Sequence, residues 1–371
     1  MVSIVLAATL LAALELGPGG SSDPARQGAV PDRQPTRPEA RAGRERRPAQ
    51  RPQTARSISG PDCSNISVGL TPLTELRPAI YMGAEGGLYP GAKNSPPRAH
   101  AGAGRDIVRR IRPLTPSGEY DGDGRYVLLS IGVSNTEAEF SAFEEVAASE
   151  PSKDDDLVVV NGSQGGVAAA QWADPSNEAW STIDDRLAAA GVTPRQVAIA
   201  WVKVANRIDP QVPPEPWPAY AQDLQRDMES IARILADRYP NIRVAYYSSR
   251  VYGGYADDGP GNPEPFAYES GFSVKWMIER QILGAPGLNY DPARGSVEAP
   301  WLAWGPYLWA DGLRRRADGL AWRCSDFQSD GTHPSLSGQE KVAALLLEFL
   351  TTDPSAVEWF TSAGGRHRRA S

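Results

Sequence analysis

The feature that most restricts the fold of this chain is the alternation of short apolar runs with helical segments between residues 126 and 350. Four runs have the length and apolar character of buried strands: 126–131, 157–160, 197–204 and 242–247. Helical patterns follow them, and one places four apolar residues on a single face: Leu224, Met228, Ile231 and Leu235. Strands that alternate with helices predict an α/β fold with a central parallel sheet covered on both faces.

Polar and glycine residues stand where the first three runs end. Ser134 follows the first run, Gly166 the second and Asn206 the third. In open parallel sheets, functional groups gather at the carboxyl ends of the strands, so we expect these three residues to lie near one another. Each also has an ordinary structural explanation, because Ser134 can cap a helix and the other two can be turn residues.

His333 lies in the segment Ser329-Asp-Gly-Thr-His-Pro334, just before a last amphipathic helix at about 337–351. The other two histidines stand in a Pro/Gly/Ala-rich stretch (His100) and in a basic tail (His367). Imidazole, with a pKa of about 6.5, suits proton transfer near neutral pH, and Asp330 stands three residues before it. Because Asp-Gly is also a strong turn signal, the alternative is a loop histidine beside a turn aspartate.

These residue types match the requirements of acyl transfer. A serine hydroxyl must stand at a sharp strand-to-helix turn, with a histidine that takes its proton and a carboxylate that orients the histidine. Further donors must point at the oxyanion of the tetrahedral intermediate. The order of these residues, at successive strand ends, predicts serine hydrolase chemistry.

The order Ser134, Gly166, Asn206 and then Asp330-x-x-His333 resembles the SGNH (GDSL-type) hydrolases over about residues 126–350. The resemblance implies a flavodoxin-like three-layer α/β/α sandwich and the hydrolysis of esters. It makes Ser134 the nucleophile of a triad with Asp330 and His333. It also makes Ser134, Gly166 and Asn206 the oxyanion donors.

Three details of the family pattern need comment. Gly166 is preferred to the nearby glycines because a family motif of the kind Asn-x-x-x-x-Gly would begin at Asn161. Gly-Val-Ser stands at 132–134 where the family usually has Gly-Asp-Ser, and Val-Ala-Asn-Arg at 204–207 replaces Gly-x-Asn-Asp. Neither departure removes a group that does chemistry, but both make a non-catalytic relative an alternative.

A long insertion at residues 248–312 brings aromatic side chains and an arginine. We expect four of the aromatic residues to line the substrate site, with packing in the core as the alternative: Tyr252, Trp301, Trp304 and Tyr307. Arg250 follows the fourth strand. It is expected either to bind a carboxylate or sulfate in the cleft or to form an ion pair with Asp257 or Glu269.

The two ends of the chain differ in composition from its middle. The apolar run 4–14 is too short to span a bilayer and resembles the apolar region of a secretory signal, although no Lys or Arg precedes it. Residues 17–57 are rich in Pro and Arg and predict a disordered linker. With a net charge of −7 and basic ends, the middle is acidic, which argues against nucleic acid as the main partner. We predict a secreted or extracytoplasmic protein without an integral membrane segment.

The chain contains two cysteines, Cys63 and Cys324. Pairing them suits an oxidising compartment, so we predict a disulfide that ties the amino-terminal extension to the loop that carries His333. Two thiolates without a histidine cluster or a second cysteine pair make a poor metal site, and we expect neither a metal nor an organic cofactor. Glycosylation sequons occur at Asn65 and Asn161, and sugar is not expected at the second, which falls in the glycine-rich motif.

These features divide the chain into four parts: a signal-like segment and linker at 1–57, an irregular extension at 58–125, an SGNH-like catalytic domain at 126–352 and a tail at 353–371. We expect a secreted serine esterase that hydrolyses O-acyl esters, such as O-acetyl esters, of a carbohydrate or similar polar substrate. One alternative is a non-catalytic glycan-binding protein on the same fold. Another is a phosphohydrolase, although the scarcity of histidines counts against a metal-dependent form.

Overall fold

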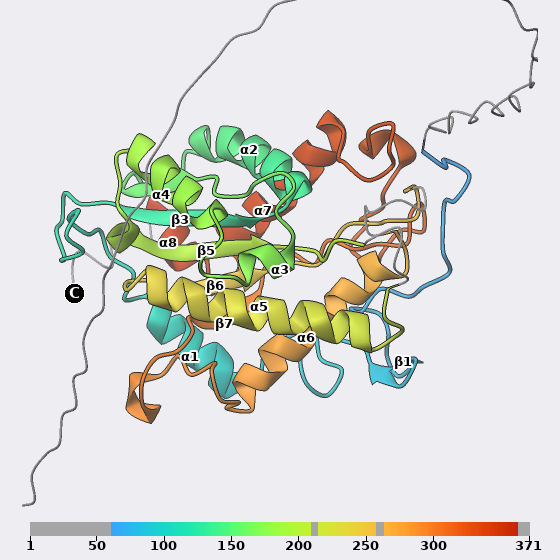
Figure 1. Cartoon of the computed structure of the whole chain (residues 1–371), viewed down its shortest axis with the longest axis horizontal. Helices are drawn as coiled ribbons and strands as arrows, with labels where there is room; N and C mark the ends of the chain where they lie inside the picture. Colours follow the sequence, from blue (N-terminus) through green and yellow to red (C-terminus); the bar gives the residue numbers. More distant parts are fainter. Residues whose placement is uncertain (1–60, 209–213, 257–262, 363–371) are drawn as a thin grey trace, which may run out of the picture. The chain divides into compact units, whose positions relative to one another are not determined.

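The computed structural model describes residues 61–208, 214–256 and 263–362. A five-stranded sheet forms its centre, with helices packed around it (Figure 1). The strands are β1 Ile80–Tyr81, β2 Ala84–Glu85, β3 Tyr126–Gly132, β4 Leu157–Val160, β5 Val197–Lys203, β6 Val244–Tyr247 and β7 Trp301–Trp304. The helices are α1 Arg98–Val108, α2 Ser134–Ala148, α3 Ala169–Trp172, α4 Ala179–Ala189, α5 Ala219–Arg238, α6 Phe266–Ile282, α7 Leu336–Thr352 and α8 Val357–Phe360.

The central sheet has the strand order β4-β3-β5-β6-β7, and all neighbouring pairs are parallel. Counted along the chain within this sheet, the order is 2-1-3-4-5, which is that of the flavodoxin-like folds. All residues of β3 and β5 are buried, because a central strand covered on both faces is kept from water. The predicted α/β fold with a central parallel sheet is confirmed.

The helices form the two outer layers. Since crossovers between parallel strands are right-handed, α2, which leads from β3 to β4, lies on one face. The helices α5 and α6, which lead in the opposite direction to β6 and β7, lie on the other face. The helix α7 packs against α2, and α6 packs against α5 (Figure 1). The connections from β3 and β5 therefore diverge, which creates the type of crevice where ligands bind in open α/β sheets.

Three parts of the chain contribute more to the fold than their composition indicates. The strand β7 lies inside the segment 248–312 that was expected to be a long insertion, and its flanking prolines are tolerated because it is an edge strand. In the amino-terminal extension, α1 is helical, and Leu73 and Val108 belong to the main core. Trp359 and Phe360, placed in the predicted tail, are fully buried in α8.

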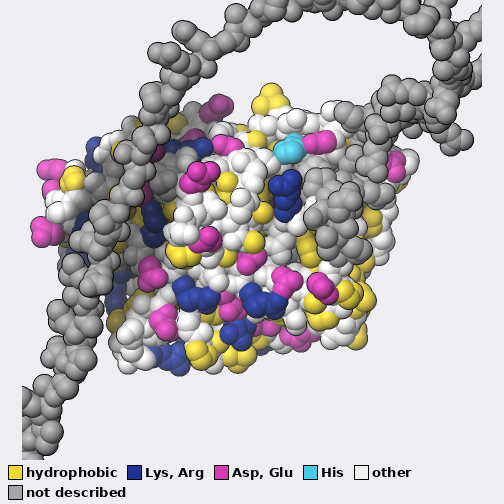
Figure 2. Space-filling view, in the orientation of Figure 1, with side chains coloured by type: hydrophobic (Ala, Val, Ile, Leu, Met, Phe, Trp, Pro, Cys, Tyr) yellow, Lys and Arg dark blue, Asp and Glu magenta, His cyan; other side chains and the backbone are white. Residues whose placement is uncertain are grey.

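The surface seen in Figure 2 carries acidic and basic side chains interspersed with apolar ones. In the described part of the chain, no helix is both long enough and apolar enough to cross a bilayer. The apolar run 4–14, the linker 17–57 and His367 lie outside the described residues.

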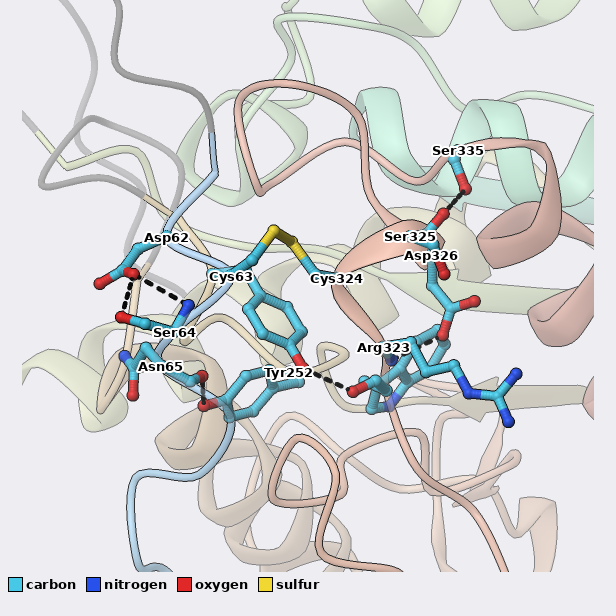
Figure 3. The surroundings of a disulfide bond; sticks show 12 residues. Asp62, Cys63, Ser64, Asn65, Tyr252, Arg323, Cys324, Ser325, Asp326 and Ser335 are labelled. Atoms are coloured by element: carbon cyan, nitrogen blue, oxygen red, sulfur yellow. Dashed lines mark hydrogen bonds between the residues drawn. A yellow bond between two sulfur atoms is a disulfide. The ribbon is translucent and has the colours of Figure 1, made fainter.

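A disulfide joins Cys63 to Cys324 across 261 positions of the sequence, with the two Cα atoms 5.3 Å apart (Figure 3). Cys324 opens a short 3₁₀ turn that ends at Asp326, next to the loop that carries His333. On the other side, the Tyr252 hydroxyl donates a hydrogen bond to the backbone carbonyl of Asn65 at 2.7 Å. The beginning of the described chain is thus fastened beside the histidine loop.

Replacing both cysteines, in Cys63→Ser/Cys324→Ser, is expected to lower the free energy of unfolding by about 2–5 kcal/mol. The bond restricts a very long loop of the unfolded chain, and its loss leaves that loop free. Chemical denaturation followed by circular dichroism measures the change. A reductant should destabilise the parent protein and leave the double variant unaffected; equal stability of the two proteins would contradict this role.

Candidate active site

Ser134 stands at a sharp turn between the central strand β3 and the helix α2. Val133 has an extended backbone, and Ser134 is the first residue of α2. A Cβ atom at Gly132 would lie 2.4 Å from the Cβ of Thr136 and 2.5 Å from the carbonyl oxygen of Lys203, so the turn requires glycine there. The backbone N–H of Ser134 belongs to the positive end of the α2 dipole.

The hydroxyl of Ser134 lies beside the imidazole of the last loop. The distance from Ser134 Oγ to His333 Nε2 is 2.9 Å, and His333 Nδ1 is hydrogen-bonded to Asp330 Oδ2. Because an ionised carboxylate can only accept, Nδ1 carries the proton and Nε2 accepts from Ser134. The structure thus brings the three residues predicted to form a triad into one hydrogen-bonded chain.

The carboxylate of Asp330 is held by backbone donors as well. Its Oδ1 accepts the N–H groups of Thr332 at 3.0 Å and of His333 at 2.9 Å. Partial burial raises the pKa of Asp330, but the hydrogen bonds from the His333 ring and from these N–H groups outweigh burial and lower the pKa below its ordinary value. Asp330 is therefore ionised throughout the neutral range, as an orienting carboxylate must be.

The site is open to solvent. The side chain of His333 is 42% exposed and that of Asp330 is 45% exposed. Figure 2 shows a histidine next to an acidic side chain on the surface of the molecule. A bulky molecule can therefore reach the imidazole without a rearrangement of the fold.

The loop that carries His333 is fastened to α2 by Asn135. This residue follows Ser134 directly, is 2% exposed, and its Nδ2 donates to the carbonyl of Thr332 at 2.8 Å. In the same loop, Gly331 has a φ of +65°, and a Cβ atom there would lie 1.9 Å from the carbonyl oxygen of Tyr255. Asn135 was not predicted from the sequence, where its only signal is its position next to Ser134.

Of the glycines after β4, Gly166 is the one placed to donate to a ligand. It has a φ of +82° and borders the same cavity as Ser134. The N–H of Gly162 donates to Ser130 Oγ at 3.2 Å, and that of Gly165 donates to Glu137 Oε2 at 2.8 Å. Within the described part of the chain, no residue accepts a hydrogen bond from the Gly166 N–H.

Asn206 follows β5 and also borders the cavity. In the amide orientation that gives both ends a partner, Nδ2 donates to Asp227 Oδ2 at 3.1 Å and Oδ1 accepts from the Leu224 N–H at 3.2 Å. Burial raises the pKa of Asp227, partly offset by the charge of Arg226. The helix α5 therefore sets the position of the Asn206 amide at the rim of the cavity.

The cavity in front of Ser134 has a volume of about 370 Å³. Its apolar lining consists of small side chains: Val133, Val167, Ala168 and Ala205. Its polar lining comes from the residues already described and from Arg207 and Arg250. Among the residues that the structure describes, no group of three or more His, Cys, Asp or Glu side chains is arranged to hold a metal ion.

Arg250 borders this cavity but is itself 5% exposed. Burial lowers the pKa of its guanidinium, and the charge of Glu139 opposes that effect. Of the two acidic partners expected from the sequence, Glu269 accepts a hydrogen bond from the Tyr81 hydroxyl at 2.7 Å, and Asp257 lies outside the described residues. Arg250 is thus a buried cation at the edge of the site.

A fully buried ion pair lies behind the turn that carries Ser134. Lys203 Nζ, at the end of β5, is 2.5 Å from Glu139 Oε2 on α2, and both side chains are 0% exposed. Replacing Lys203 by Met is expected to lower the free energy of unfolding by about 3–5 kcal/mol, because the fully buried Glu139 carboxylate loses its ion-pair partner. The double variant Lys203→Met/Glu139→Leu should recover most of the loss in chemical denaturation. Equal stability of the single and double variants would show that the two charges are not coupled.

The expectation that four aromatic residues line the substrate site is wrong. The four are buried away from the cavity: Tyr252, Trp301, Trp304 and Tyr307. Trp301 opens β7 at the amino edge of the sheet, whereas Ser134 stands at the carboxyl edge. The other three hydrogen-bond backbone groups of the amino-terminal extension, at Asn65, Leu73 and Leu88. Residues far upstream in the sequence pack over these side chains and bury them. The sequence of the insertion itself does not indicate this packing.

No family model matches this chain, and no curated protein matches it. Several solved structures are similar to it at low identity, and three of them are described here. A gut microbial diltiazem-metabolizing enzyme is 13% identical over 60% of this chain and 46% of its own, less than half of its length, with a TM-score of 0.33. A Bacteroides fragilis protein described as an acylhydrolase is 10% identical over 71% and 95%, with a TM-score of 0.32. The catalytic domain of Streptococcus pneumoniae peptidoglycan O-acetyltransferase A is 11% identical over 62% and 94%, with a TM-score of 0.30.

Proposed function

We propose that this chain is a serine esterase of the SGNH type that hydrolyses O-acyl esters through an acyl-enzyme. The observation that supports this most strongly is the hydrogen-bonded chain from Ser134 through His333 to Asp330 at the rim of a cavity. A serine that only caps a helix and an aspartate that only forms a turn need no imidazole between them. A serine nucleophile needs one to take its proton.

In the proposed reaction, Ser134 Oγ bonds to the ester carbonyl carbon while His333 Nε2 takes the hydroxyl proton. The N–H groups of Ser134 and Gly166 and the amide of Asn206 hold the resulting oxyanion. The intermediate then collapses: the carbon–oxygen bond to the alcohol breaks, and the alcohol takes the proton from His333. Water attacks the acyl-enzyme with His333 again as the base, and the carboxylic acid leaves Ser134 free.

The lining and the exposure of the site support a small acyl group on a large polar alcohol. Small Val and Ala side chains line the cavity beside Ser134 and leave room for an acetyl or other short acyl chain. The exposure of His333 leaves room outside the cavity for a carbohydrate or similar polar alcohol. The Cys63–Cys324 disulfide supports action in an oxidising, extracytoplasmic compartment.

The glycan-binding alternative was motivated by the departures at 132–134 and 204–207, and it would hold the glycan with loop aromatics beside the site. Because those side chains are buried and do not border the cavity of Ser134, the alternative is left without that binding surface. Acetylated sugars and a graded series of p-nitrophenyl esters, from acetate to octanoate, test the esterase proposal. We expect the highest kcat/KM for acetate and a decline with chain length. A preference for octanoate would refute the short-acyl specificity, and a folded protein without activity on any ester would refute the enzyme.

The role of Asn206 is tested by Asn206→Ala. We expect kcat to fall by roughly 10²–10³-fold, because one oxyanion donor is lost while the triad remains. The KM for the acetate ester should change much less, since the ground-state carbonyl needs the donor less than the transition state. Asn94→Ala, an exposed asparagine away from the cavity, serves as the control and should leave kcat unchanged. If both variants lowered kcat by a similarly small factor, Asn206 would not be an oxyanion donor.

A further inference from the structure

A second cavity lies at the amino edge of the sheet, at the opposite ends of the strands from Ser134. It has a volume of about 310 Å³ and is bordered by the region after α1, the start of β6 and β7, and the segment before β7. Its walls are mostly apolar and include Ile242, Tyr290, Val297 and Trp301. Its charged lining consists of two arginines, Arg110 and Arg243. A volume of this size is within the range of sites that bind small organic molecules.

Among the described residues, no carboxylate is an ion-pair partner of either arginine. Many other arginines of the chain pair with carboxylates, such as Arg125 with Asp156, but no described carboxylate forms an ion pair with Arg110 or Arg243. Both arginines are exposed and border the cavity. Partial desolvation lowers the pKa of the Arg243 guanidinium, and the positive charge of Arg110 lowers it further, so the two cations lie within range of each other. A guanidinium pair beside an apolar wall offers forked donors to an anion, and an anion would remove their mutual repulsion.

The aromatic wall of this cavity is held in a fixed position. Trp301 is 2% exposed, and its ring stacks on that of His100 with the centroids 4.9 Å apart. A Cβ atom at Gly104 would lie 2.3 Å from Trp301 Cζ2, so α1 presses directly on the indole. The indole N–H of Trp301 has no hydrogen-bond partner among the described residues. The wall is therefore formed before any ligand arrives, and the ordering cost of binding is low.

We propose that this cavity binds an organic monocarboxylate. The carboxylate lies between Arg110 and Arg243, and the apolar body packs against Ile242, Tyr290 and Trp301. The carboxylate of the ligand matches the two arginines, which have no counter-ion among the described residues. The apolar body of the ligand matches the rigid apolar wall. This site is independent of the proposed esterase activity, because none of its residues borders the cavity of Ser134.

Calorimetric titration of the full chain with n-hexanoate tests the proposal. Arg110→Gln and Arg243→Gln should each weaken binding roughly ten-fold or more, because each removes a charged hydrogen-bond donor. The control is Arg105→Gln, which removes one positive charge from the exposed surface of α1, outside the cavity lining. This variant should bind hexanoate with the affinity of the parent. Hexanamide, which has the same chain without the charge, should bind at least ten-fold more weakly.

A variant that keeps both arginines separates loss of binding from loss of folding. Val297 is 49% exposed at the cavity wall, and Val297→Asp puts a competing carboxylate beside the arginines. We expect the same weakening of hexanoate binding and unchanged kcat on an acetate ester. The proposal would be overturned if the parent did not bind hexanoate, or if Arg105→Gln and Arg243→Gln bound it with equal affinity. It would also be overturned if inorganic sulfate bound as tightly as hexanoate. Hexanoate binding that persists in a Ser134→Ala variant shows that the site stands whether or not the esterase proposal does.

Discussion

Replacing Ser134 by Ala is expected to lower kcat/KM on an acetate ester by about 10⁴-fold or more. Ser134 Oγ is 2.9 Å from His333 Nε2, and Ser134 is the only serine among the described residues that border the cavity. Without the hydroxyl no acyl-enzyme forms, and only the oxyanion donors remain to assist attack by water. Initial rates at saturating and limiting ester concentrations measure the loss.

The control for this variant is chosen on the same helix. Ser141→Ala removes an exposed hydroxyl of α2 and should leave kcat/KM within two-fold of the parent, roughly the noise of surface substitutions. His333→Ala should match the loss in Ser134→Ala, and the double variant should be no slower than either, because residues of a triad act as a unit. Additive losses, or more than a tenth of the activity in Ser134→Ala, would mean that the ester is cleaved elsewhere.

Asp330→Asn is expected to lower kcat by about 10⁴-fold while leaving the fold intact. The Asn oxygen can still accept the N–H groups of Thr332 and His333. Its amide nitrogen, however, donates to the His333 ring and favours the tautomer whose Nε2 carries the proton. That tautomer cannot take the proton of Ser134. Steady-state kinetics on the acetate ester and a thermal melt measure the two effects; a loss of ten-fold or less would leave Asp330 as a turn residue.

The lowered pKa of Asp330 also fixes the sign of its effect on stability. Its folded-state pKa lies below the unfolded value, so the contribution to stability is fully present above the unfolded pKa of about 3.9. It is lost as the pH falls through the folded-state value. Chemical denaturation of the parent and of Asp330→Asn at pH 7 and pH 3 should therefore show a difference that shrinks toward the lower pH. A difference that grows on acidification would contradict the direction of the shift.

Most of the sheet could be predicted from the sequence because its strands are buried on both faces and stand out as apolar runs. The runs at 126–131 and 157–160 match β3 and β4 closely. The strand β7 could not be predicted in the same way, since its two tryptophans are flanked by Pro300 on one side and Gly305-Pro306 on the other. Its membership of the sheet depends on contacts with β6 that no local pattern records.

Site residues could be predicted from the sequence where they directly follow a buried strand or precede a helix, because the ends of adjacent parallel strands lie close together. Ser134 and His333 were found because one closes a buried run and the other precedes a helix. Asn135 and the placement of Trp301 were not, since both depend on which distant segment packs against them. Tyr252 was expected to line the substrate site, but its hydroxyl donates to the backbone carbonyl of Asn65, nearly two hundred residues upstream.

The most direct test of the proposed nucleophile is the site of covalent modification by a fluorophosphonate. The purified full chain is incubated with the probe, digested and analysed by peptide mass spectrometry. We predict a single phosphonylated serine, Ser134, with loss of esterase activity in proportion to labelling and no adduct in Ser134→Ala or His333→Ala. Esterase activity that survives full labelling, or an adduct on another serine that accounts for its loss, would contradict the triad described here.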